Sequence, residues 1–159
     1  MTEREGTDDK GPGAVVHPPV LFFATLLAGL VLQFLFPLRF VNSLLVQLST
    51  GLPVIGVGLG LGGWASRTVL KAGTKLNPHS PVRSLVTHGP FRFSRNPLYL
   101  SGIIILLGIA VAVDTLWLIL LMPIGLILIS LQVRREEEYL EARFGEEYRK
   151  YKGRVRRWL

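Results

Sequence analysis

Four stretches of this sequence carry almost no charged side chain, and this arrangement restricts the possible folds more than any other feature. The stretches cover residues 20–36, 44–65, 98–113 and 115–133. The first stretch has 17 residues, and a helix of that length rises roughly 26 Å, just enough to cross the hydrocarbon core of a bilayer. We therefore predict an all-α, polytopic membrane protein with about four transmembrane helices.

The last two stretches predict a tight antiparallel hairpin, residues 98–133, because only Asp114 separates them. The tail that follows, residues 134–159, contains apolar residues at helical spacing. These residues are Leu140, Phe144, Tyr148 and Tyr151, at steps of four, four and three. The spacing is typical of an amphipathic helix, and Gly145 is expected to kink or cap it.

The chain divides into a flexible polar leader (residues 1–19), two transmembrane helices (20–65), and a half that holds a polar loop, the hairpin and the tail (66–159). Six basic residues in the loop at 66–96 and nine in the tail make 15 of the 18 in the chain. The hairpin places the loop and the tail on one side of the membrane. Since basic loops stay in the cytoplasm, both termini and the loop are expected there, at a plasma or inner membrane.

Composition and charge exclude several classes of protein. The net charge of +7 would suit nucleic acid on a soluble surface. Here the basic residues border apolar stretches, so the expected partner is the lipid bilayer with its anionic headgroups, and no nucleic acid. The absence of cysteine excludes disulfides and thiolate chemistry. His79 and His88 lack a carboxylate pattern and predict no metal site, and spans without ionisable residues argue against a transporter.

The second apolar stretch is rich in glycine between residues 56 and 63. A dinucleotide-binding loop would need a preceding strand and a following soluble helix, and neither is expected here. Small residues at this density let membrane helices approach closely. The segment therefore predicts helix packing.

Polar side chains concentrate in two segments, residues 73–99 and 132–157, at the two ends of the hairpin. Because the hairpin returns the chain to its starting side, the two segments are expected to meet and to form a composite site at the membrane surface. Glu136 precedes Leu140 by four residues and continues the apolar stripe of the tail, so it is the tail acid expected to face inward. A buried carboxylate needs a partner, which a cofactor ammonium or hydroxyl group would supply.

Both segments resemble a known family. The stretch LVTHGPFRFSRNPLYL, residues 85–100, resembles the pattern G-(P/V)-(Y/F)-x-x-x-R-(H/N)-P-x-Y. The tail resembles the pattern E-E-x-x-L-x-x-x-F-G-x-x-Y-x-x-Y-x-x-x-V. These patterns are those of the isoprenylcysteine carboxyl methyltransferase family, membrane enzymes that use S-adenosylmethionine (SAM) and are related to the phospholipid N-methyltransferases. The resemblance covers roughly residues 70–157, about half of the chain.

The resemblance implies a SAM site between the loop and the tail, with a lipid-facing entrance for the methyl acceptor. The cofactor-binding residues that it implies are Arg83, Ser84, Leu85, Val86, Phe91, Asn96, Pro97, Leu98, Tyr99, Glu136 and Glu137. The catalytic residues would be Glu136 with Arg134 or Arg135, because a guanidinium can orient an anionic acceptor bidentately. The expected acceptor is a lipophilic or prenylated small molecule, foremost a carboxylate of the isoprenylcysteine type. The sulfonium already makes the methyl group electrophilic, so no metal is required.

Two positions depart from the family pattern. Asn96 stands where carboxyl methyltransferases commonly carry histidine. Gln132 stands where eukaryotic enzymes place an arginine that meets the acceptor. A phospholipid amine or another lipid amine is therefore the alternative acceptor.

Simpler interpretations compete with this one. The acidic run 136–138 can be a solvated face that pairs with Arg134 and Arg135. Pro97 can simply begin a helix, and Arg92 and Arg95 can hold lipid phosphates. Under these interpretations the protein is a non-enzymatic membrane assembly protein, and a reductase that binds a nicotinamide cofactor is a further possibility. The run 156–158 is interpreted as an interfacial anchor.

Overall fold

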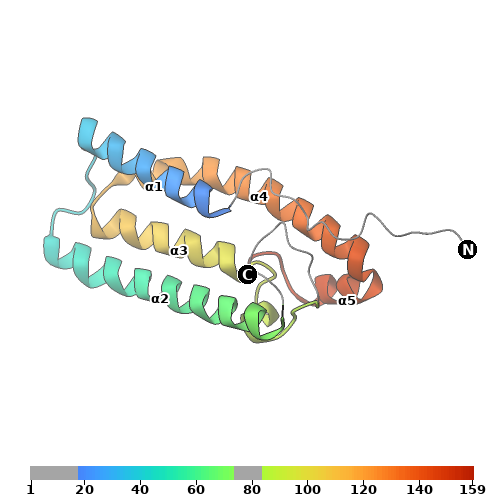
Figure 1. Ribbon diagram of the computed structural model, residues 1–159. Helices are drawn as coiled ribbons and strands as arrows, with labels where there is room; N and C mark the ends of the chain where they lie inside the picture. Colours follow the sequence, from blue (N-terminus) through green and yellow to red (C-terminus); the bar gives the residue numbers. More distant parts are fainter. Residues whose placement is uncertain (1–17, 74–83) are drawn as a thin grey trace, which may run out of the picture.

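The structure is a computed structural model that describes residues 18–73 and 84–159. In these ranges the chain is helical, without a strand, which confirms the predicted all-α fold (Figure 1). The elements are α1 (Pro18–Leu35), α2 (Leu44–Lys71), the 3-10 helix η1 (Gly89–Arg92), α3 (Pro97–Ala112), α4 (Leu116–Phe144) and α5 (Glu146–Arg154). Almost all of the leader expected at residues 1–19 lies outside the described residues.

The helices α1 to α4 run side by side in an elongated bundle, in which α2 packs along α3 and α1 packs along α4 (Figure 1). At one end, which we call the site end, α5 folds back beside α4 and η1 packs against α2. The opposite end, which we call the far end, holds the loop between α1 and α2 and the turn between α3 and α4. This arrangement brings the loop before α3 and the segment after α4 to the same end.

Large apolar side chains cover the outside of the bundle. Phe34 is 86% exposed, Leu45 77% and Phe23 70%, a density that a water-soluble surface does not show. Among the described helices, α2 and α4 are long and apolar enough to span a bilayer, and α1 and α3 are shorter apolar helices. The chain is therefore a helical membrane protein, and its exposed apolar side chains face lipid.

Glycines let α2 and α3 pack closely. A methyl group on Gly51 would lie 2.7 Å from the backbone nitrogen of Ala112, and one on Gly108 would lie 2.7 Å from that of Ile55. Within the glycine-rich stretch, a Cβ on Gly58 would lie 2.6 Å from the Ile105 side chain and one on Gly62 would lie 2.9 Å from the Ser101 hydroxyl. Helix packing therefore explains these two glycines, as predicted. The glycines at positions 56, 60 and 63 face open space instead, with no atom within 4 Å of the position of an added Cβ.

Alanine at position 51 is expected to destabilise the bundle, because its Cβ would collide with backbone atoms of α3. Backbone atoms cannot move aside by a change of rotamer, so the two helices would have to separate. Alanine at position 60 should be neutral or stabilising, since it meets no neighbour and gains about 1 kcal/mol of helix propensity. Thermal unfolding in detergent should rank Gly60→Ala at or above the parent protein and Gly51→Ala clearly below it. Equal melting temperatures for the two variants would contradict this close packing.

Asp114 organises the far end. Its backbone adopts a φ of 50° in the turn between α3 and α4. Its Oδ1 accepts hydrogen bonds from the backbone N–H groups of Phe40 and Val41, at 2.8 and 2.7 Å, and its carbonyl accepts one from the Gln33 side chain at 3.2 Å. Asp114, the ionisable residue in the hairpin turn, therefore fixes the position of the α1–α2 loop through hydrogen bonds to its backbone.

The structure corrects two predicted helix boundaries. The second helix runs to Lys71 and not to residue 65, and α4 continues past residue 133 to Phe144. The tail is therefore divided at Gly145, where a kink or cap was expected: its first part belongs to α4 and its second part is α5. Arginine, glutamate, leucine and alanine after residue 133 are strong helix formers, so the helix does not end where lipid ends. Gly145 ends α4 with a φ of 54°, as the expected cap.

Candidate functional site

The two polar segments expected to meet do lie together at the site end. We call residues 94–99, which lead from η1 into α3, the corner. Asn96 precedes α3, and Pro97 is its first residue, a position where the missing N–H of proline costs no hydrogen bond. The part of α4 beyond residue 133 passes beside the corner and carries three consecutive glutamates, residues 136–138.

Glu136 forms a polar cluster with one residue of α3 and one of α4. The hydroxyl group of Tyr99 donates to its Oε1 at 2.6 Å, and the amide of Gln132 donates to the same oxygen at 3.1 Å. Tyr99 is 8% exposed and Gln132 is 4% exposed, while Glu136 is partly buried. Both donors are neutral, so among the described residues the carboxylate is oriented without being paired to a cation. We call these three residues the Glu136 cluster.

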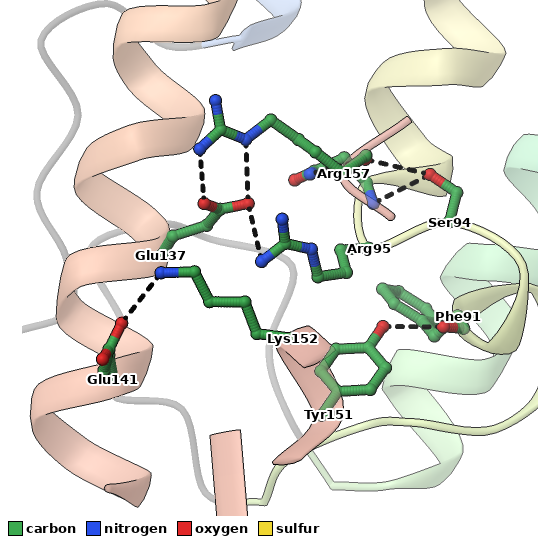
Figure 2. Close-up of polar contacts among 9 residues, drawn as sticks. Phe91, Ser94, Arg95, Glu137, Glu141, Tyr151, Lys152 and Arg157 are labelled. Atoms are coloured by element: carbon green, nitrogen blue, oxygen red, sulfur yellow. Dashed lines mark hydrogen bonds and ion pairs between the residues drawn. The ribbon is translucent and has the colours of Figure 1, made fainter. Parts of the chain in front are cut away.

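Glu137 has the opposite environment, because two arginines hold it (Figure 2). Arg157 donates to both carboxylate oxygens, at 3.1 and 2.7 Å, and Arg95 forms an ion pair with Oε1 at 3.3 Å. The side chains of Arg95 and Glu137 are only 9% and 7% exposed. The hydrogen bonds to Glu137 raise the pKa of Arg157. The charge of Glu137 is therefore neutralised within the protein.

The segment 155–159 returns to the corner and hydrogen-bonds to it. The carbonyl of Arg157 accepts from the Ser94 hydroxyl at 3.2 Å and from the Asn96 amide at 3.0 Å, and the carbonyl of Arg156 accepts from the Arg95 backbone at 3.0 Å. Trp158 is partly buried against the apolar cluster beneath the Glu136 cluster. Its interpretation as an interfacial anchor stays a prediction.

Two buried tyrosines attach α5 to this assembly. Their rings meet edge to face, with centroids 6.1 Å apart, and the hydroxyl of Tyr151 donates to the carbonyl of Phe91 at 2.7 Å (Figure 2). Tyr148 is 1% exposed, and burial, assisted by the charge of Glu137, raises its pKa to about 12. The amphipathic pattern of the tail thus marks the residues that hold η1 in place.

The structure brings together some of the predicted cofactor-binding residues. Tyr99 and Glu136 are in contact, whereas Asn96 and Glu137 bond mainly to the segment 155–159. Others lie on the path between α2 and α3: the hydroxyl of Ser84 donates to the carbonyl of Ala72 at 2.9 Å. Leu85, Val86, Phe91 and Leu98 are partly buried, Pro97 is buried, and Arg83 lies outside the described residues.

Arg134 and Arg135 are exposed, and neither forms an ion pair with a residue in the described ranges. The interpretation of residues 136–138 as a solvated face paired to these arginines is therefore wrong for Glu136 and Glu137. Arg95 is too buried to hold a lipid phosphate at the surface. Arg92 is exposed and lies over the ring of Phe93, with its guanidinium carbon 4.6 Å from the ring centroid.

Arg157 is the site residue that sequence reasoning missed. It follows its partner Glu137 by 20 residues, and the break at Gly145 lies between them. The tail sequence did contain one indication that Glu137 has a cationic partner. Glu137 lies three residues before Leu140 and so also belongs to the inward face of the helix. A carboxylate there requires a cation, and the nearby basic residues of the tail included it.

Comparison with known proteins supports an enzymatic role. Residues 46–147, more than half of the chain, match the family described as phospholipid methyltransferase. A stretch of 68 residues is 48% identical to an uncharacterized protein of Haemophilus influenzae, over 39% of this chain and the whole of that protein. No solved structure matches. The matched family is the relative that the motifs indicated, and the isoprenylcysteine subtype stays a prediction.

Proposed function

We propose that this chain, which belongs to the phospholipid methyltransferase family and is therefore a membrane methyltransferase, takes its methyl group from SAM and transfers it to a lipophilic amine. The observation that carries the proposal is the Glu136 cluster, in which a partly buried carboxylate accepts hydrogen bonds from two neutral groups. Burial raises the pKa of Glu136, whereas the hydrogen bonds from Tyr99 and Gln132 lower it. A bound cation would favour the charged form of this poorly solvated carboxylate. It is suited to a cationic ligand.

The donor set fits SAM, which carries a sulfonium and an α-ammonium group. When bound, SAM supplies a methyl group whose bond to sulfur breaks as the lone pair of the acceptor binds the carbon. Glu136 would hold a cation beside the acceptor, while Tyr99 and Gln132 fix the direction of its carboxylate. The apolar cluster of Tyr99, Ile129 and Val133 would exclude water from this side. Alignment and exclusion of water are the main requirements of methyl transfer.

The same cluster favours an amine acceptor over a carboxylate. A methylated amine keeps a positive charge next to Glu136, whereas an anionic acceptor would be repelled by it. The buried position that would hold an acceptor-binding arginine in the related enzymes carries Gln132, and Gln132 donates to Glu136. The isoprenylcysteine carboxylate is the second candidate. It is supported by Arg135, which is exposed, forms no ion pair with the described residues and lies one helical turn from Gln132.

We also propose that the site end faces the cytoplasm. The described basic residues of the loop and the tail lie at this end, whereas Arg39 and Asp114 are near the far end. The excess of positive charge on one side sets the orientation of membrane helices. Protease protection of the tail in sealed inverted vesicles tests this orientation, and a protected tail would contradict it.

Addition of SAM is expected to raise the melting temperature of the detergent-solubilised protein, because a ligand of the native state stabilises it by about 2.7 kcal/mol at 100 times its Kd. NADPH at the same concentration should leave the melting temperature unchanged. A shift with NADPH alone would support a membrane reductase. No saturable shift with either compound would support a non-enzymatic assembly protein and refute the proposal.

The acceptor can be identified with SAM labelled in its methyl group. Protein in nanodiscs should transfer label to an aminophospholipid or a long-chain amine, and not to a lipid that has a choline headgroup and therefore no free amine. A prenylated cysteine with a free carboxylate is the competing substrate in a parallel reaction. Label in a base-labile methyl ester would favour the carboxylate acceptor over the amine.

A further inference from the structure

The segment 155–159 contacts the sites of both neighbouring glutamates, but through different residues. Arg157 binds Glu137 directly, through two hydrogen bonds. Trp158 packs against the apolar cluster of Tyr99, Ile129 and Val133, and the hydroxyl of Tyr99 holds Glu136. One short segment is therefore positioned to control which carboxylate is available to a ligand and where that carboxylate points.

The charges divide unequally between the two glutamates. Glu137 faces two guanidinium groups, so this buried group of three carries a net positive charge. Among the described residues, Glu136 accepts hydrogen bonds from the neutral groups of Tyr99 and Gln132 only. Without Arg157, Glu137 would keep only its ion pair with Arg95 among the described residues. The Nε and Nη1 atoms of Arg95 are buried, and neither has a well-aligned hydrogen bond to a described residue. Because Arg157 occupies both carboxylate oxygens of Glu137, Glu137 is already paired within the protein. Glu136 is then the carboxylate available to a cationic ligand.

The position of Tyr99 depends on its apolar surroundings. Its hydroxyl group reaches Glu136 from the first turn of α3, and its ring belongs to the cluster against which Leu21, Phe22 and Trp158 pack. Among these three neighbours, Trp158 comes from the segment that also binds Glu137, whereas the other two come from α1. Loss of the indole would leave part of the cluster unsupported, and the ring of Tyr99 would gain freedom to leave Glu136.

We propose that the segment 155–159 is a positioning clasp for Glu136, with Trp158 and Arg157 as positioning residues that act through Tyr99 and Glu137. The inference rests on the proposed function, because it assigns the clasp to the affinity for SAM. Neither residue needs to touch the cofactor. The clasp joins the corner, α4 and α5 into one site, so that the carboxylate is in place before the ligand binds.

Steady-state kinetics on full-length Trp158→Ala protein in nanodiscs test the clasp. The KM for SAM is expected to rise about tenfold, because the Glu136 carboxylate that would bind SAM is no longer held in position. The values of kcat and of the KM for the acceptor should stay within about twofold, because no group at the reacting atoms has changed. Trp158→Phe retains an aromatic ring and should recover most of the affinity for SAM.

Lys150→Ala is the matched control, because Lys150 is an exposed residue of α5, and it should behave as the parent protein. If Trp158→Ala does not fold, Arg157→Lys provides the second test, since it keeps the charge but loses the bidentate contact, and it should also raise the KM for SAM alone. An unchanged KM for SAM, or a fall in kcat with an unchanged KM, overturns the clasp. A parent protein that does not bind SAM refutes the proposed function instead.

Discussion

Glu136→Gln is expected to weaken SAM binding by about 10- to 100-fold, which corresponds to about 1.5–3 kcal/mol for a hydrogen bond to a charged group. The glutamine keeps the shape of the side chain, and its Oε1 can still accept from Tyr99 and Gln132. The substitution therefore removes the negative charge and leaves the fold intact. Equilibrium binding of radiolabelled SAM to the purified variant measures the effect.

Glu138→Gln is the matched control for this experiment. Glu138 lies two residues further along α4 and is exposed, so its replacement should change SAM affinity by less than twofold. The melting temperatures of both variants without ligand should equal that of the parent protein. SAM affinity unchanged in Glu136→Gln would show that the cofactor does not use this carboxylate, whatever the family of the chain.

The sequence predicted the helices well because each long apolar stretch has one stable structure in lipid. It predicted their ends less well. Arg67 and Lys71 follow the second apolar stretch, and both belong to α2, because a charge ends the contact with lipid but not the backbone hydrogen bonds of a helix. The hairpin turn was placed correctly at Asp114, although the contacts of this residue to Phe40 and Val41 depend on a loop that has no pattern of its own.

The site was predictable where a helical period links its residues. Glu136 was assigned to the inward face from its spacing to Leu140, and it accepts a hydrogen bond from Tyr99 of α3. The partner of Glu137 was not predictable in this way, since Arg157 lies beyond the break at Gly145 and no period crosses such a break. The tail contains several arginines, and only the three-dimensional path of the chain determines which of them pairs with Glu137.

Glu137→Gln is expected to be the most destabilising of the substitutions considered. The amide leaves Arg95 buried without a carboxylate, and removal of one partner from a buried ion pair costs about 3–5 kcal/mol. The lower end applies, because Arg157 is 32% exposed and regains water. At about 2–4 °C per kcal/mol for a chain of this size, the melting temperature should fall by about 10 °C.

Two further variants separate the loss of charge pairing from other causes. Glu141 lies on the same helix as Glu137 and forms surface ion pairs with Lys152 and Arg149 of α5. Glu141→Gln breaks these pairs and should change the melting temperature little, since water replaces the lost contacts. Adding Arg95→Gln to Glu137→Gln removes the stranded cation and should recover part of the stability, because the cost lies in the unpaired charge. If the double variant is less stable than Glu137→Gln by the full effect of Arg95→Gln alone, the two residues are not coupled. The buried ion pair would then not be what holds the corner against α4.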